Sequence, residues 1–187
     1  MDAFEVLVAS IFERDGFWVR PSFKVELTKE EKCAIRRPSS PRWELDLIAY
    51  KAGTNELRII ECKSYLDSRG VGINAFIGSN EKLKSRFKIF NEQYLCEVVV
   101  QRLITQLLGT KSILADPKII ICLAVGKFSS DKDKIAVKEL FNHKGWELLD
   151  NEWLCRRLKL IAKGSYQNEV LDVVAKILIR TKINRVI

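Results

Sequence analysis

Residues 43–65 read WELDLIAYKAGTNELRIIECKSY. Two short apolar runs, residues 43–50 and 57–65, flank the segment GTN at 53–55, and this arrangement predicts a β-hairpin. Both runs contain charged residues, although apolar runs of this kind form strands that are buried on at least one face. A charge in such a place costs several kcal/mol unless it is paired or bound to a metal ion. The charges of the hairpin are therefore the first candidates for a functional site.

Side chains in a strand alternate between the two faces of a sheet. In the first run this alternation places Glu44, Asp46 and Ile48 on one face and Leu45, Leu47 and Ala49 on the other. In the second run it places Ile59, Glu61 and Lys63 on one face and Ile60 and Cys62 on the other. When the two runs pair, Asp46, Glu61 and Lys63 come together on one surface. Glu44 is expected as a spare ligand or as an ion-pair partner of Arg42 or Lys63.

The spacing of these charges resembles a known motif. Asp46 is followed, after fourteen residues, by Glu61, Cys62 and Lys63. This is similar to the PD-(D/E)xK nuclease superfamily, the fold of type II restriction enzymes and archaeal Holliday-junction resolvases. There an acidic residue on one strand faces (Asp/Glu)-x-Lys on its hairpin partner. The run ELDLIA at 44–49 resembles the Mrr-like and resolvase-like branches, although Leu45 replaces the proline that gives the motif its name.

The resemblance implies a metal-dependent endonuclease that hydrolyses phosphodiester bonds in DNA. Mg²⁺, or Mn²⁺ in its place, is the implied cofactor, with Asp46 and Glu61 as carboxylate ligands. The backbone carbonyl of Cys62 is the further ligand that the superfamily uses. Lys63 is expected to orient the attacking water and to stabilise developing negative charge. Three alternatives remain open: an inactive nucleic-acid-binding module of the same fold, an RNA-directed nuclease, and a structural salt bridge.

Residues 2–15 predict a helix, because apolar residues recur at the helical period and Gly16 follows. Asp2 is the expected N-cap, and Glu5 lies three residues later as the second member of a capping box. The resemblance gives Glu5 another role, because many members of the superfamily carry a glutamate on the first helix that reaches the metal site. The two roles are compatible, so Glu5 is also a candidate catalytic residue.

The remaining sequence predicts an α/β protein of one domain, residues 1–187. The expected elements are a strand at 17–25, a loop or irregular strand at 26–42, an irregular loop at 65–81, a helix at 90–108, a strand at 118–125, a helix from 130 to 142, a strand at 146–150, a helix at 152–163 and a final helix around 170–178. This order resembles the restriction-endonuclease-like αβββαβ core, a central mixed sheet flanked by helices, over roughly residues 1–150. Residues 151–187 are then a C-terminal helical extension.

The chain carries 32 Lys and Arg against 24 Asp and Glu, a formal net charge of +8. This excess suggests a polyanionic partner, most simply DNA, although a merely basic surface explains the charge equally well. The expected nucleic-acid contacts are Arg42 before the hairpin and Lys82, Lys84 and Arg86 after it. A homodimer is a further expectation, since symmetric cutting of both strands needs two sites, whereas nicking needs one.

Five cysteines stand far apart, at 33, 62, 96, 122 and 155, with no CxxC pair. This spacing argues against a structural zinc site. It predicts free thiols in a reducing cytoplasm, buried at the last four positions, which lie in apolar segments. The start of the sequence has no basic region and no long apolar run, so we expect neither a signal peptide nor a membrane span.

Overall fold

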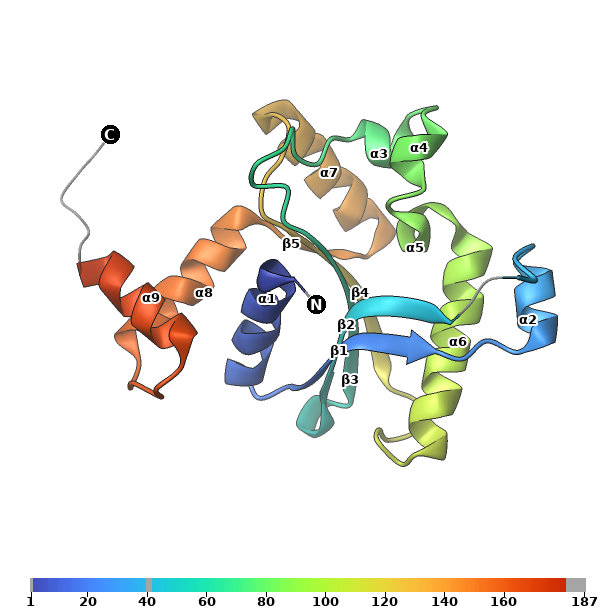
Figure 1. The fold of residues 1–187 in the computed structure, drawn as a ribbon, viewed down its shortest axis with the longest axis horizontal. Helices are drawn as coiled ribbons and strands as arrows, with labels where there is room; N and C mark the ends of the chain where they lie inside the picture. The colour runs from blue at the N-terminus through green and yellow to red at the C-terminus, as the bar shows by residue number, and fades with distance from the viewer. Residues whose placement is uncertain (1, 40–41, 181–187) are drawn as a thin grey trace.

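The computed structural model describes residues 2–39 and 42–180. Residues 181–187 of the predicted C-terminal extension therefore lie outside the described residues. The chain forms a five-stranded mixed sheet with the strand order β1-β2-β3-β4-β5, flanked by helices on both faces (Figure 1). The elements in chain order are α1 (Ala3–Arg14), β1 (Trp18–Val25), α2 (Lys29–Ala34), β2 (Trp43–Lys51), the 3-10 turn η1 (Ala52–Thr54), β3 (Glu56–Lys63), α3 (Asn74–Ile77), α4 (Glu81–Lys84), α5 (Lys88–Asn91), α6 (Gln93–Gly109), β4 (Lys118–Val125), α7 (Asp131–Lys144), β5 (Glu147–Leu149), α8 (Asn151–Lys163) and α9 (Val170–Arg180).

The first three strands are antiparallel, whereas β3 pairs in parallel with β4, and β4 with β5. The connection from β3 to β4 runs through α3 to α6, and the connection from β4 to β5 runs through α7. Parallel neighbours need such crossovers, because the chain must return to the same end of the sheet. The carboxyl ends of β3 and β4 therefore lie at one edge of the sheet.

Each face of the sheet has its own hydrophobic core. The core under α6 includes Ile48, Ile59, Leu103 and Phe141, and α7 contributes to this layer. The core under α1 contains other residues of the same strands, including Leu47, Ala49, Ile60 and Cys62 from the hairpin, together with side chains of α8 and α9. In Figure 1, α1, α8 and α9 accordingly lie on one side of the sheet and α6 and α7 on the other. This split confirms the predicted alternation from residue 47 onward.

Local sequence signals account for the helix ends. The capping box of α1 is formed: the Asp2 carboxylate accepts hydrogen bonds from the amides of Phe4 and Glu5, and Glu5 Oε2 accepts one from the Asp2 amide at 3.1 Å. Ser130 caps α7 through the amide of Asp133, and Gly145, with a φ of 70°, ends it. Gly145 suits this position because its left-handed conformation costs a glycine little.

Several predicted boundaries are wrong. Residues 26–42 were expected as a loop or irregular strand, but Thr28 begins the short helix α2 with a capping box to Glu31. The expected irregular loop at 65–81 contains the helix α3 and the start of α4. The long helix begins at Gln93, after the separate short helix α5. Short helices of this kind have too few residues to show a periodic pattern, and only capping residues such as Thr28 and Glu31 mark them in the sequence.

Leu45 is a second correction. Alternation placed it on the face of Leu47 and Ala49, yet it packs in the core under α6, with Ile48 and Ile59. The strand is therefore twisted out of regular alternation between residues 45 and 47. Its neighbour β1 is distorted at the same level: Ser22 falls opposite Asp46 in the register, is missing from the ladder and has a φ of 47°.

The cysteines are free thiols, with Cys62 and Cys122 buried, Cys96 half-buried and Cys33 exposed. Cys155 is exposed on α8, which contradicts the predicted burial, because it lies on the outer face of an amphipathic helix. None of the helices in the described ranges is long and apolar enough to span a membrane.

Candidate active site

The site begins where β2 separates from β3. The backbone register of the hairpin runs from the pair Lys51–Glu56 to the pair Leu47–Ile60 and ends there. Beyond it the Asp46 carboxylate accepts a hydrogen bond from the Cys62 amide, with 2.8 Å between Oδ2 and N. A side chain thus takes the role that a backbone carbonyl has in a regular ladder. The strands diverge at this point, and the edge of the sheet opens.

Lys63 connects the two carboxylates of the predicted motif. Its Nζ donates a hydrogen bond to Glu61 Oε1 and lies 3.9 Å from Asp46 Oδ2. The three side chains are partly buried, with 18% of Lys63, 25% of Asp46 and 21% of Glu61 exposed. They are therefore largely desolvated but remain open to solvent on one side. The Lys63 ammonium also lies 5.9 Å from the ring centre of Phe87.

An open pocket of about 410 Å³ lies over Asp46 and Lys63, whereas Glu61 is not part of its lining. We call it the acidic pocket, and its lining consists of Asp2, Glu5, Asp46, Cys62, Lys63, Ser64, Tyr65 and Arg86. The pocket lies between the N-terminal end of α1, the carboxyl end of β3 and the segment after α4. A small polyanion can reach Lys63 and Asp46 from this side.

The pKa shifts show that Glu5, Asp46 and Glu61 are close enough to interact electrostatically. Burial raises the pKa of Glu61, and the charges of Asp46 and Glu5 raise it further against the opposing effect of Lys63. Burial and the Asp46 charge likewise raise the pKa of Glu5. Like charges held this close disfavour full ionisation, and a bound cation relieves that repulsion. The pKa shifts of Glu61 and Glu5 therefore reflect a local excess of negative charge that Lys63 only partly offsets.

Lys63 keeps its charge. Burial opposes its charged form, but the carboxylates of Glu61 and Asp46 outweigh burial, so the pKa of Lys63 is raised. A lysine with a raised pKa is an ammonium ion at neutral pH and cannot accept a proton there. Its available chemistry is to hold a negatively charged oxygen or a water molecule by hydrogen bonds.

The oxygen atoms of Asp46 and Glu61 are the kind of ligand that a hard divalent cation prefers, but in the described part of the chain only these two carboxylates are in place. Magnesium is usually held by one or two carboxylates, with waters and substrate phosphates completing its coordination. Asp46 and Glu61 can supply those carboxylates, because each has lone pairs beyond its present hydrogen bond. Within residues 2–39 and 42–180, no group of three or more His, Cys, Asp or Glu side chains is arranged to hold a metal ion. Burial raises the pKa of the Cys62 thiol, so only the backbone carbonyl of this residue is a suitable ligand.

Of the four predicted nucleic-acid contacts, Arg86 lines the acidic pocket. Arg42, Lys82 and Lys84 do not line it. Arg42 pairs with Glu26 at 3.2 Å, and Lys84 pairs with Glu81 at 3.6 Å. Glu44 is exposed, and its predicted partners Arg42 and Lys63 pair with other carboxylates, so the ion pair expected for it is wrong.

Two lining residues had no role in the sequence-based site. Ser64 and Tyr65 line the pocket directly after β3, and Tyr65 has a left-handed φ of 45°. A bulky residue in this conformation costs about 1–3 kcal/mol, and such residues concentrate at functional sites. The sequence feature that marks Ser64 and Tyr65 as site residues is their position directly after Lys63. Asp2, expected only as a helix cap, lines the pocket as well.

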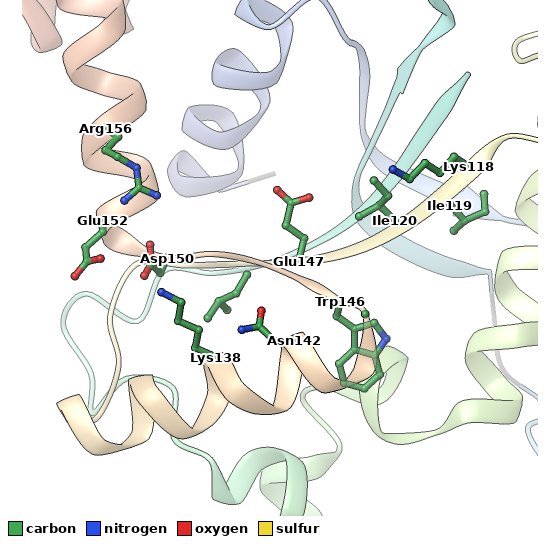
Figure 2. Close-up of a pocket in the computed structure, with 12 residues that line it drawn as sticks. Lys118, Ile119, Ile120, Lys138, Asn142, Trp146, Glu147, Asp150, Glu152 and Arg156 are labelled. Atoms are coloured by element: carbon green, nitrogen blue, oxygen red, sulfur yellow. The ribbon is translucent and has the colours of Figure 1, made fainter. Parts of the chain in front are cut away.

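A second pocket, of about 440 Å³, lies at the far edge of the sheet, around β5 (Figure 2). Figure 2 shows Glu147, Asp150 and Glu152 around it, with Lys138 and Arg156. Its carboxylates already have cationic partners: Glu147 pairs with Arg58, and Lys134 pairs with Asp150 and Glu152. The hairpin carboxylates do not line this pocket, so it is separate from the candidate active site.

Comparison with models of protein families, with curated proteins and with solved structures finds no match for this chain.

Proposed function

We propose that the protein is a metal-dependent endonuclease of the PD-(D/E)xK type that hydrolyses phosphodiester bonds in DNA. One observation carries the proposal: Lys63 contacts both Glu61 and Asp46 where β2 leaves β3. The succession of α1, three antiparallel strands, α6 and the parallel strand β4 supports it, because this is the order of the αβββαβ core.

Asp46 and Glu61, with the backbone carbonyl of Cys62, are the groups that would hold Mg²⁺ or Mn²⁺. When bound there, the cation would neutralise charge at the scissile phosphate and lower the pKa of a water molecule. The two carboxylates belong to adjacent strands, so the rigid sheet fixes their separation. Rigid strands hold such groups more accurately than loops do.

Lys63 stabilises the negative charge that develops on the phosphate during hydrolysis. It remains an ammonium ion because Glu61 and Asp46 raise its pKa, and its contact with the Phe87 ring limits its movement. A donor of this kind, fixed before the reaction begins, is worth about a hundredfold or more in rate. Arg86 supplies a second positive charge at the pocket and holds the phosphate from the other side.

Glu5 lines the acidic pocket together with Asp2 and Asp46. Its hydrogen bond to the Asp2 amide fixes the start of α1, while its charge interacts with that of Asp46. The residue thus connects the first helix to the hairpin site. In the proposed enzyme it orients water or assists in holding the cation.

The test is cleavage of supercoiled plasmid DNA in the presence of Mg²⁺ or Mn²⁺. The wild type is expected to nick or linearise the plasmid, and Lys63→Ala is expected to lower the rate at least about a hundredfold. Lys159→Ala removes the same charge from an exposed site on α8, outside the pocket and outside the predicted nucleic-acid contacts, and is the matched control, with activity near that of the wild type. Full activity of a folded Lys63→Ala variant rules out the assignment.

A DNA-binding module that has lost turnover is the second candidate. It is favoured by the absence, among the described residues, of a three-residue metal-ligand group and by the engagement of Glu61 with Lys63. This candidate predicts DNA binding in EDTA without cleavage in either metal. An RNA-directed nuclease is distinguished by comparing duplex DNA, branched DNA and RNA as substrates.

A further inference from the structure

A third pocket, of about 230 Å³, adjoins the acidic pocket. We call it the loop pocket, and its lining consists of Tyr65, Ser68, Arg69, Gly70, Val71, Gly72, Asn74, Ala75, Leu83, Arg86, Phe87, Ser129 and Asp133. Tyr65 and Arg86 line both pockets. A ligand that places a phosphate beside Lys63 can therefore extend directly past Tyr65 and Arg86 into the loop pocket.

The wall formed by residues 68–73 is fixed by hydrogen bonds to the segment after β4. The Val71 amide donates to the Lys127 carbonyl at 2.9 Å, and Lys127 Nζ donates to the Ser68 carbonyl at 2.8 Å. Gly70 has a φ of 93°, and an added Cβ there would lie 2.5 Å from the carbonyl carbon of Phe128. Only glycine allows this close approach, so the loop is held in one conformation.

The opposite wall is also fixed. The Asn91 side chain donates to the carbonyls of Ala75 and Lys84, at 2.8 Å and 3.0 Å, and so joins α3 and α4. The Asp133 carboxylate already accepts hydrogen bonds from Ser129, Ser130 and the Ile73 amide. Asp133 is therefore part of the wall. The pocket is preformed, and a ligand need not order it.

The side chains of the loop pocket that can contact a ligand are of the types that bind nucleobases. The floor is apolar, with Val71, Ala75 and Phe87 buried. Tyr65 contributes an aromatic ring to the lining, and Arg69 and Arg86 contribute guanidinium groups, of which that of Arg69 interacts electrostatically with the Asp133 carboxylate. Aromatic rings and guanidinium planes stack on unpaired bases.

We propose that the loop pocket receives one unstacked base of single-stranded or frayed DNA, next to the phosphate held in the acidic pocket. A base inside a duplex is stacked and paired, and it cannot enter without paying to leave the stack. The pocket therefore selects unpaired DNA. That the bound base lies next to a phosphate undergoing hydrolysis rests on the proposed nuclease function. That the loop pocket binds an unpaired base does not depend on it.

The experiment measures binding in EDTA, so that cleavage plays no part. A short labelled single strand and the blunt duplex of the same sequence are titrated against the protein by fluorescence anisotropy. The single strand is expected to bind at least about fivefold more tightly, the range of one base–aromatic stack.

Leu83→Trp fills the loop pocket from the partly exposed helix α4, and it is expected to remove the preference for the single strand while leaving duplex binding unchanged. Leu108→Trp is the matched control, since Leu108 is 38% exposed against 37% for Leu83 and lines neither pocket. If circular dichroism shows that Leu83→Trp is misfolded, Tyr65→Ala provides the same test by removing the ring.

Three outcomes overturn the inference, whether or not the protein cuts DNA. They are equal affinity for the two DNA forms, no binding of either form, and an unchanged preference for the single strand in a folded Leu83→Trp variant. A preference that Leu83→Trp abolishes, in a protein that cuts no DNA with Mg²⁺ or Mn²⁺, supports the loop pocket and rejects the nuclease proposal. The two failures are thus distinguishable.

Discussion

The Asp46 carboxylate accepts the backbone hydrogen bond of Cys62, at 2.8 Å, where the backbone pairing of their two strands has ended. This contact holds the acid beside Glu61 and Lys63, and it ties the candidate site directly to the geometry of the sheet. A change at Asp46 therefore affects both the stability and the proposed chemistry, and two substitutions separate these effects.

Asp46→Asn keeps an oxygen that can accept the Cys62 amide, so we expect the fold to persist while metal binding and cleavage are lost. Asp46→Ala leaves a largely buried amide without an acceptor and is expected to lower the free energy of unfolding by about 1–3 kcal/mol. Urea denaturation measures the stability, and calorimetric titration with Mn²⁺ measures the binding.

Glu44→Ala is the control for both variants, because Glu44 is exposed two residues away on the same strand. Its effect on stability is expected to stay within about 0.5 kcal/mol. Equal stability of Asp46→Ala and Asp46→Asn would show that the hydrogen bond to Cys62 contributes nothing to the fold.

Glu5→Gln is expected to stabilise the metal-free protein at neutral pH. The folded protein raises the pKa of Glu5 above its ordinary value of 4.5, so ionisation of this group weakens the fold as the pH rises through and above that value. Glutamine keeps an acceptor for the Asp2 amide and removes the repulsion with Asp46. The advantage should vanish below pH 4.5, where the wild-type carboxyl is protonated in both states.

Thermal unfolding of the wild type and Glu5→Gln at several pH values measures whether the variant is the more stable protein at neutral pH only. Glu13→Gln, an exposed change on the same helix, serves as the control for charge alone. A gain in stability that persists in acid would show that repulsion from Asp46 is not its cause.

Mn²⁺ is expected to raise the melting temperature more at neutral pH than near pH 4.5. The pKa of Glu61 lies above that ordinary value of 4.5, so in acid a proton competes with the cation for this carboxylate. A ligand that binds only the folded state stabilises it by an amount that grows with the logarithm of its affinity. Glu61→Gln should abolish the rise, and removal of the metal with EDTA should reverse it. A rise of the same size in Glu61→Gln would place the cation elsewhere.

Arg14 and Asp172 form an ion pair between α1 and the C-terminal helix α9, and Asp172 is fully buried. Asp172→Ala leaves the largely buried Arg14 charge with Glu169, 3.2 Å away, as its remaining partner and is expected to lower the free energy of unfolding by about 1–3 kcal/mol. The double change Arg14→Met and Asp172→Leu is expected to recover most of the loss, since it removes both charges. Urea denaturation measures these effects, and an additive loss in the double variant would contradict them.

Much of the fold follows from local signals. The two apolar runs with their turn define the hairpin, the continuous run of β4 begins and ends where predicted, and Asp2, Ser130 and Gly145 mark helix ends. The grouping of Asp46, Glu61 and Lys63 is also predicted from the hairpin, but the structure forms it beyond the last regular pair of the two strands, through the contact of the Asp46 carboxylate with the Cys62 amide. The short helices α2 to α5 do not follow, since a few residues show no periodicity and their positions depend on contacts with distant parts of the chain.

The sequence alone thus determined an α/β fold with three charged residues on one hairpin. Only the tertiary structure turned Leu45 away from alternation, gave the Asp46 carboxylate to the Cys62 amide, and brought Glu5 and Arg86 to the same pocket. The physical reason is that these features depend on contacts between segments far apart in sequence. The strand divergence at Asp46 coincides with a distortion in β1, and the two pockets meet at Tyr65 because a loop after β3 is hydrogen-bonded to the chain after β4.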